Sequence, residues 1–110
     1  MNTAEKNHLE IHLDPEGFYL TPDNWDKDVS SILAQNIGIT ILSDDHWKVI
    51  IALRTHYERF GVAPAIHNVC HSFHKEEKWV HNLFFNCLNA WRVAGLPDPG
   101  EEANAYLSDM

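Results

Sequence analysis

The clearest pattern of apolar and polar positions in the chain is helical and lies between Ser43 and Gly61. Large apolar residues recur there at spacings of three and four, which is typical of an amphipathic helix with one buried face. Ser43 is followed by two aspartates and has the side chain of a good N-cap, while Gly61 can adopt the left-handed conformation that ends a helix. The pattern therefore predicts a long helix between these residues. Pro64 then suits the first turn of another helix.

Before this helix the pattern alternates. Residues 9–13 alternate apolar and polar side chains, residues 14–17 contain the turn formers Pro and Gly, and residues 18–20 are apolar again. This arrangement predicts a β-hairpin, which must pack on helices because two strands alone are marginally stable. Thr21, which is followed by proline, resembles an N-cap and predicts a helix that continues to about Asn36.

Three shorter helical patterns follow the long helix, within residues 64–74, 79–84 and 88–94. Residues 95–100 cannot continue a helix because their prolines lack an amide donor. Residues 101–110 are acidic, and we expect them to be mobile. The expected fold class is α+β, with an N-terminal β-hairpin packed on an array of about five helices and a mobile C-terminal arm.

The length of 110 residues fits one domain. We assign residues 1–8 to a disordered N-terminus, residues 9–100 to a single domain and residues 101–110 to an acidic tail. Hydrophobic residues make up 45% of the chain, so it can bury a core without disulfides or metals. We expect six residues to form part of the structural framework: Trp47, Ile50, Tyr57, Pro64, Gly95 and Pro97.

The charge of the chain narrows the choice of partners. Eight basic and 16 acidic residues give a net charge of −8, which disfavours nucleic acid and favours a protein partner.

No apolar run approaches the ~20 residues of a membrane span, and the polar first eight residues argue against a secretory signal. With only two cysteines, reduced thiols and a cytoplasmic location are the expectation. We expect no cofactor and either a monomer or a homodimer.

The two cysteines are candidates for thiol chemistry. Cys70 shares its helical spacing with Ile66, Val69 and Phe73, which places it in the core. Cys87 is the better candidate for a reactive thiol. The simpler interpretation of either residue is a small buried apolar side chain, because no helix N-terminus or basic pair is placed to lower its pKa.

A row of histidines is the other candidate site. His67, His71 and His74 recur on one side of a helix together with Cys70, and His81 could add a ligand from the next helix. Zinc or nickel would accept such a set, but the pattern lacks an acidic ligand or a CxxC pair, and an exposed polar stripe is the simpler interpretation. We therefore assign no metal site.

The predicted helices also allow two other interpretations, a DNA-binding helix-turn-helix and an enzyme active site. The helix after Pro64 follows a tight turn, as in a helix-turn-helix, but it carries no Lys or Arg before Lys75. His46 and Arg54 could act as a general base and an anion-binding group. We interpret them, with their aromatic neighbours, as architecture.

Several short motifs in the chain resemble the DsrC/TusE family, small sulfur-trafficking proteins associated with dissimilatory sulfite reductase and with tRNA thiolation. The matching residues are Gly38-Ile39, His46-Trp47, Val49-Ile50, Arg54, Tyr57, Pro64-Ala65-Ile66, Ala94-Gly95-Leu96-Pro97 and Pro99. The resemblance implies a flexible C-terminal arm whose penultimate cysteine carries persulfide sulfur. Some members of the family have a second cysteine just before the Ala-Gly-Leu-Pro stretch.

Neither family cysteine is present here. Alignment on the Ala-Gly-Leu-Pro stretch puts Glu102 at the position of the terminal cysteine and Trp91 at the position of the second. A carboxylate cannot carry sulfane sulfur, so the resemblance implies a non-enzymatic accessory or regulatory protein that binds a sulfur-relay or sulfite-reductase partner. Two alternatives stay open: a sulfur carrier that uses Cys87, and a small DNA-binding or metal-sensing regulator.

Overall fold

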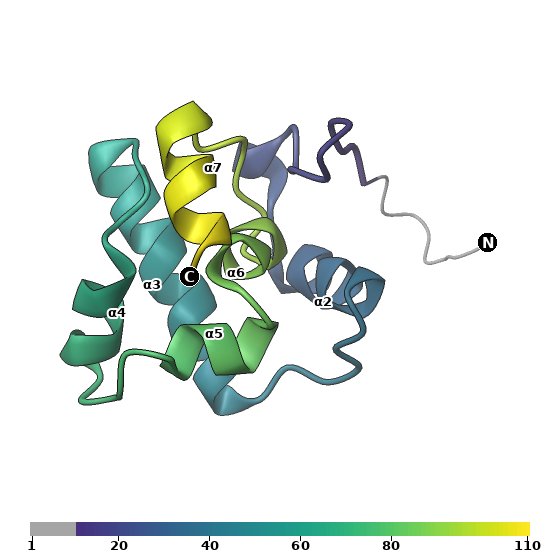
Figure 1. Ribbon diagram of the computed structural model, residues 1–110. Helices are drawn as coiled ribbons and strands as arrows, with labels where there is room; N and C mark the ends of the chain where they lie inside the picture. The colour runs from purple at the N-terminus through teal and green to yellow at the C-terminus, as the bar shows by residue number, and fades with distance from the viewer. Residues whose placement is uncertain (1–10) are drawn as a thin grey trace.

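The computed structural model describes residues 11–110, and the regular structure in this part of the chain is helical (Figure 1). The elements follow one another as a 3-10 helix, η1 (Pro22–Asn24), and six α-helices, α2 (Lys27–Asn36), α3 (Asp44–Phe60), α4 (Ile66–Ser72), α5 (Trp79–Phe84), α6 (Cys87–Val93) and α7 (Glu101–Ser108). Across these residues no helix is both long and apolar enough to cross a bilayer. The segment of residues 1–8, predicted to be disordered, lies outside the described residues.

The long helix α3 has the bounds that the sequence predicts. The Ser43 hydroxyl accepts a hydrogen bond from the backbone amide of His46, and Gly61 ends the helix with a φ of 71°. Val49, Ile50 and Leu53 are fully buried on its inner face. The local signals at both ends and the apolar stripe therefore agree with the tertiary structure.

The short helix α6 is the hub of the molecule, because it contacts α2, α3, α5 and α7. Cys87, Ala90, Trp91 and Val93 are all buried on it. Such a helix is apolar on nearly every side, as expected for one that is surrounded by others.

The predicted N-terminal β-hairpin is wrong, and the fold is α rather than α+β. Within residues 11–110 the two segments share only an isolated antiparallel bridge between Leu13 and Tyr19. The Asp14 carboxylate stabilises the turn by accepting hydrogen bonds from two backbone amides. Leu13 and Leu20 remain 36% and 57% exposed, so the alternation does not provide a buried sheet face. Residues 9 and 10 of the predicted first strand lie outside the described part.

The predicted helix that follows begins later than expected. Residues after Thr21 form only the turn η1, and Trp25 is extended. Asp26 is the N-cap of α2, since its side chain accepts from the amide of Val29 at 3.1 Å. The predicted end at Asn36 is confirmed. The helix begins later because the Asp26 carboxylate caps it, whereas the Thr21 side chain makes no cap hydrogen bond.

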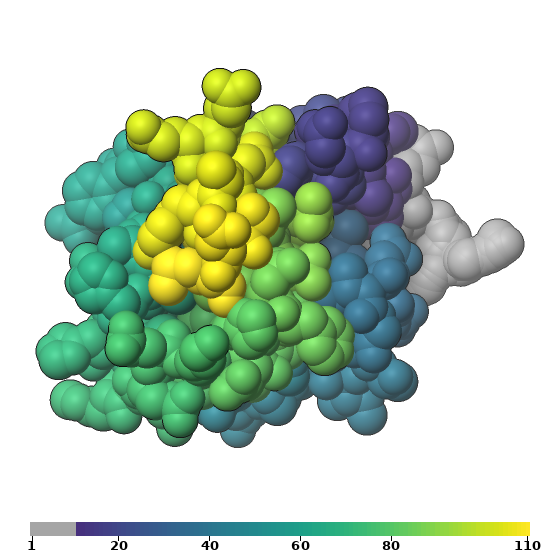
Figure 2. Space-filling model, in the orientation of Figure 1, coloured from purple at the N-terminus to yellow at the C-terminus, as the bar shows by residue number. Residues whose placement is uncertain are grey.

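The predicted mobile C-terminal arm is also wrong. Residues 101–108 form helix α7, which contacts α6 and buries Leu107 completely. The side chain of Met110 packs on the core after the helix ends. Figure 2 shows this yellow segment lying against the body of the molecule. The C-terminal residues are thus part of the fold.

Candidate functional site

The segment between α6 and α7 is fixed to the core by Arg54. The guanidinium Nη1 donates to the carbonyl oxygens of Ala94 and Gly95, at 2.8 and 3.0 Å, and Nη2 donates to the carbonyl of Pro22 at 2.9 Å. Burial lowers the pKa of Arg54, while the nearby carboxylate of Glu58 acts in the opposite sense. Arg54 therefore satisfies three main-chain carbonyls with three of the five N–H donors of its guanidinium.

Gly95 occupies a position that no other residue fits. Its φ is 72°, and a Cβ atom there would lie 2.4 Å from Cδ1 of Trp25. The Trp25 ring is itself held in place, because its Nε1 donates to the Ser30 hydroxyl at 2.7 Å, and that hydroxyl donates to the carbonyl of Val93 at 2.6 Å. The Ala-Gly-Leu-Pro stretch thus has a structural role in this chain.

Trp91, which alignment on the Ala-Gly-Leu-Pro stretch puts at the second family cysteine position, is a core residue. Its ring is almost fully buried and meets Tyr57 edge-on, with the ring centroids 5.8 Å apart. Its Nε1 donates to the carbonyl of Pro97 at 2.6 Å. The indole therefore holds Pro97 in place, at the start of the segment that leads to Glu102.

Glu102, which the same alignment puts at the terminal cysteine position, is exposed in the first turn of α7. It borders a hollow of about 660 Å³ whose other walls include Val62, Ala65 and Tyr106. A carboxylate at this end of a helix is stabilised by the helix dipole. The position is accessible to a partner, but its chemistry is that of an acid and not of a sulfur nucleophile.

The two thiols are both inaccessible. Cys70 and Cys87 are 2% and 1% exposed, and neither forms a disulfide. Burial raises the pKa of Cys87 to about 12, and the neighbouring Cys70 adds to this effect. The Cys70 Sγ lies 3.7 Å from the carbonyl of Glu77, to which it can donate. Because the thiolate is the reactive form, Cys87 is a weak nucleophile in the folded protein at neutral pH.

The histidine row is not gathered into a site. His67, His71 and His74 are exposed along and just after α4, and His81 is bonded through Nδ1 to the carbonyl of Met110. Among the described residues, three possible ligand atoms come within 4.8 Å of one another only at one group of carboxylates, namely Asp14, Glu16 and Asp98. No ligand set is thus assembled around the histidines.

His46, interpreted from the sequence as architecture, makes hydrogen bonds that the sequence pattern did not predict. Its Nδ1 accepts from the backbone amide of Ser43 at 3.0 Å, and its Nε2 lies 2.9 Å from the carbonyl of Leu83. We assign the proton to Nε2, since a carbonyl can only accept. His46 thus caps α3 and joins it to α5, and neither ring nitrogen is available as a general base. The Ser-x-x-His spacing was the available signal, with His in place of the Glu of a capping box.

The remaining framework residues differ in burial. Ile50, Pro64 and Gly95 are buried, whereas Tyr57 and Pro97 are half-buried. Trp47 is half-buried as well, and it borders a surface groove on α3. The sequence pattern could not distinguish a core tryptophan from one at the edge of the core.

The family model described as "DsrC like protein" matches residues 5–101 of this chain. The chain belongs to this DsrC-like family. It is 31% identical to the protein named sulfurtransferase TusE from Escherichia coli K12 over 99 residues, which are 82% of this chain and 90% of the relative. A TusE homologue from Haemophilus influenzae is 28% identical over 104 residues, covering 86% and 94% of the two chains.

Solved structures of the DsrC-like family share the fold. The oxidized gamma-subunit of dissimilatory sulfite reductase, DsrC, from Archaeoglobus fulgidus superposes with a TM-score of 0.76 at 27% identity, over 86% of this chain and 94% of that one. The DsrC/gamma subunit from Pyrobaculum aerophilum gives a TM-score of 0.73 at 32% identity, over 83% and 85%.

Proposed function

We propose that this DsrC-like protein acts in sulfur metabolism by binding a protein of a sulfur relay or of sulfite reductase, without carrying sulfur itself. The observation that carries the proposal is the chemistry of the two family positions. Glu102 is an exposed carboxylate and Trp91 is a buried indole. Neither can accept or donate sulfane sulfur, whereas the fold that would present a docking surface is intact.

The alternative of a carrier that uses Cys87 finds little support. A carrier thiol has to be ionised and must reach into the site of its partner. Cys87 lies at the start of α6, the helix that four others surround, and burial raises its pKa to about 12. Sulfur transfer through it would require the hub of the molecule to open. Among the described residues, neither an assembled set of histidine ligands nor a basic recognition helix supports the regulator alternative.

Intact-mass spectrometry after incubation with a persulfide donor tests the proposal. We expect the wild-type protein to gain no sulfur. The variant Glu102→Cys, which restores a thiol at the family position, should gain one sulfur atom per chain and so shows that the donor is competent. A stoichiometric gain by the wild type that Cys87→Ala abolishes would establish the carrier alternative instead.

Partner binding is tested separately by size-exclusion chromatography. The protein is mixed with purified sulfur-relay proteins or sulfite reductase from its own source organism. We expect co-elution with one of them in a complex that does not depend on either cysteine, so that a Cys70→Ala, Cys87→Ala double variant binds equally well.

A further inference from the structure

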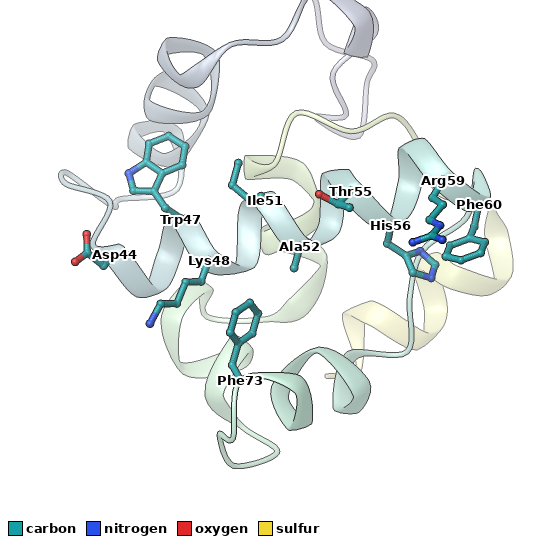
Figure 3. Close-up of a pocket in the computed structure, with 10 residues that line it drawn as sticks. All are labelled: Asp44, Trp47, Lys48, Ile51, Ala52, Thr55, His56, Arg59, Phe60 and Phe73. Carbon is teal, nitrogen blue, oxygen red and sulfur yellow. The ribbon is translucent and has the colours of Figure 1, made fainter.

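The outer face of α3, opposite its buried face, carries an apolar groove of about 770 Å³ (Figure 3). The groove follows the whole helix, from Asp44 at its first residue to Phe60 at its last. Ile51, near the middle, is 44% exposed, and Phe60 is 60% exposed. Contiguous apolar surface of this kind on a small domain is typical of an interaction site.

The shape of the groove fits a helix. Seventeen residues of α3 extend over ~25 Å, which is enough to pack along several turns of another helix. Ile51 and Ala52 lie at its centre, where the small alanine allows close approach. Figure 3 shows Phe73, from the end of α4, pointing towards α3 and so forming a side wall, while Trp47 closes the groove near one end. Apolar residues repeated at three- and four-residue spacing would fill such a groove.

The charges around the groove identify the kind of helix. Lys48 and Arg59 are the cationic residues of its lining, and Lys27 places its Nζ 5.5 Å from the centre of the Trp47 ring. Asp44 is the acidic residue of the lining. The ion pair of Lys48 with Asp45 is long, at 3.7 Å, and solvent-exposed, so it leaves the lysine available.

This basic rim contrasts with the molecule as a whole, whose net charge is −8. Acidic side chains on either side of an apolar stripe would complement the rim. A second copy of this chain fits less well, because two molecules of −8 repel each other as they approach.

We propose that the α3 groove binds an amphipathic helix of a partner protein, with the apolar face of that helix in the groove and acidic residues along its flanks. The inference rests on the proposed function, because it assigns the surface through which a partner is bound. That surface lies along α3 and shares no lining residue with the hollow beside Glu102.

A designed peptide tests the groove directly. The probe is a fluorescein-labelled helix of about 18 residues, with leucine at positions i, i+3, i+4 and i+7 and glutamate on its flanks. A matched peptide carries lysine in place of glutamate. We expect fluorescence anisotropy to show binding of the acidic peptide that weakens as salt is added, and at least about tenfold weaker binding of the basic peptide.

Matched variants locate the binding site. We expect Ile51→Glu and Arg59→Glu each to weaken binding of the acidic peptide by about tenfold or more. The control for the first is Ile41→Glu, which introduces the same charge at a strongly exposed isoleucine outside the groove. The control for the second is Lys78→Glu, at an exposed residue before α5. Both controls should bind the peptide as the wild type does, within about twofold.

Several results would overturn the groove proposal. One is equal binding of the acidic and basic peptides. Another is a loss of affinity that is no greater for Ile51→Glu than for Ile41→Glu. The third is self-association of the wild type, seen by sedimentation, that Ile51→Glu abolishes, because a second copy would then occupy the groove. The last is displacement of the peptide by a single-stranded oligonucleotide at equal charge concentration, because the groove would then bind polyanions in general.

The failure of this inference and that of the proposed function can be told apart. A sulfur-relay protein or sulfite reductase that co-elutes equally with the wild type and with Ile51→Glu removes the groove proposal and leaves the proposed function intact. If the acidic peptide binds with the expected pattern while none of those proteins co-elutes, the groove stands and the proposed function is wrong.

Discussion

The hydroxyl oxygen of Tyr106 accepts a hydrogen bond of 2.8 Å from the backbone amide of Ile66, 40 positions earlier in the chain. This bond joins α7 to the first residue of α4. The first amides of a helix lack partners within the helix, and Ala65 provides no side-chain cap for α4. Tyr106 therefore supplies an acceptor that the sequence around α4 lacks, and α7 helps to complete the fold.

Replacing Leu107 tests whether α7 is part of the core. Leu107 is fully buried, so Leu107→Ala should lower the free energy of unfolding by about 3 kcal/mol. Urea denaturation measures this change. Asp109→Ala, at an exposed residue in the same segment, is the control and should change stability by less than about 0.5 kcal/mol. Equal stability of the two variants would contradict a docked C-terminal helix.

Gly95 and Gly38 form a matched pair for testing the close approach to Trp25. Both have positive φ angles, 72° and 92°, but a Cβ at Gly95 would meet the Trp25 ring at 2.4 Å, and a Cβ at Gly38 would meet nothing within 4 Å. We expect Gly38→Ala to cost about 1 kcal/mol through the backbone alone. Gly95→Ala should cost about 2–4 kcal/mol more, because the ring must move. Thermal or urea unfolding of the two variants gives the comparison.

Arg54 should be needed for stability, because it is buried against three main-chain carbonyls. Arg54→Met keeps much of the side-chain volume but removes the donors, and should cost about 3 kcal/mol. Arg54→Lys retains the charge without the planar fork and should recover only part of the loss. Arg59→Met is the exposed control and should be nearly neutral in urea denaturation. A neutral Arg54→Met variant would mean that water or other donors replace the guanidinium.

The raised pKa of Cys87 predicts a pH dependence of stability. The folded protein holds the Cys87 proton up to about pH 12, whereas the unfolded chain releases it near the ordinary value of 9.0. Between these values the folded state binds more protons than the unfolded state, so stability falls as the pH rises. The protonated Cys87 therefore makes its full contribution to the free energy of unfolding below about pH 9. We expect wild-type stability to fall more steeply than that of Cys87→Ala from pH 9 upwards, measured by urea denaturation at each pH. Parallel curves would show that Cys87 ionises equally in both states.

The sequence predicted best the elements whose signals are local. The helix α3 has its cap at Ser43, its terminating glycine at Gly61 and a continuous apolar stripe between them, so its bounds needed no tertiary information. Given the alignment on the Ala-Gly-Leu-Pro stretch, residue identity alone shows that Glu102 and Trp91 carry no thiol, and the lack of sulfur transfer stays a prediction. A carboxylate and an indole have the same chemical limits wherever the fold places them.

The elements that were predicted wrongly depend on contacts distant in sequence. Only Leu107 is fully buried on α7, and the tyrosine beside it is bonded 40 positions away, so the acidic segment shows no pronounced stripe. The alternation in residues 9–13 predicted a strand, but a strand requires a partner along its length, and within residues 11–110 this segment has a single bridge, at Leu13. The groove on α3 was not predicted because the sequence pattern distinguishes the buried face of the helix from its outer face, but it does not show that Phe73 lies beside the outer face.

The contact between Gly95 and Trp25 bears on how sulfur carriers are recognised in genomes. The glycine is required by a left-handed backbone and by the lack of space beside the indole, and both requirements would persist after the loss of every reactive thiol. An Ala-Gly-Leu-Pro signature therefore identifies a protein that folds in this way, whether or not it transfers sulfur. Searches that use this signature alone therefore select for the fold, and the residue five positions after its proline, Glu102 in this chain, has to be inspected separately for a thiol.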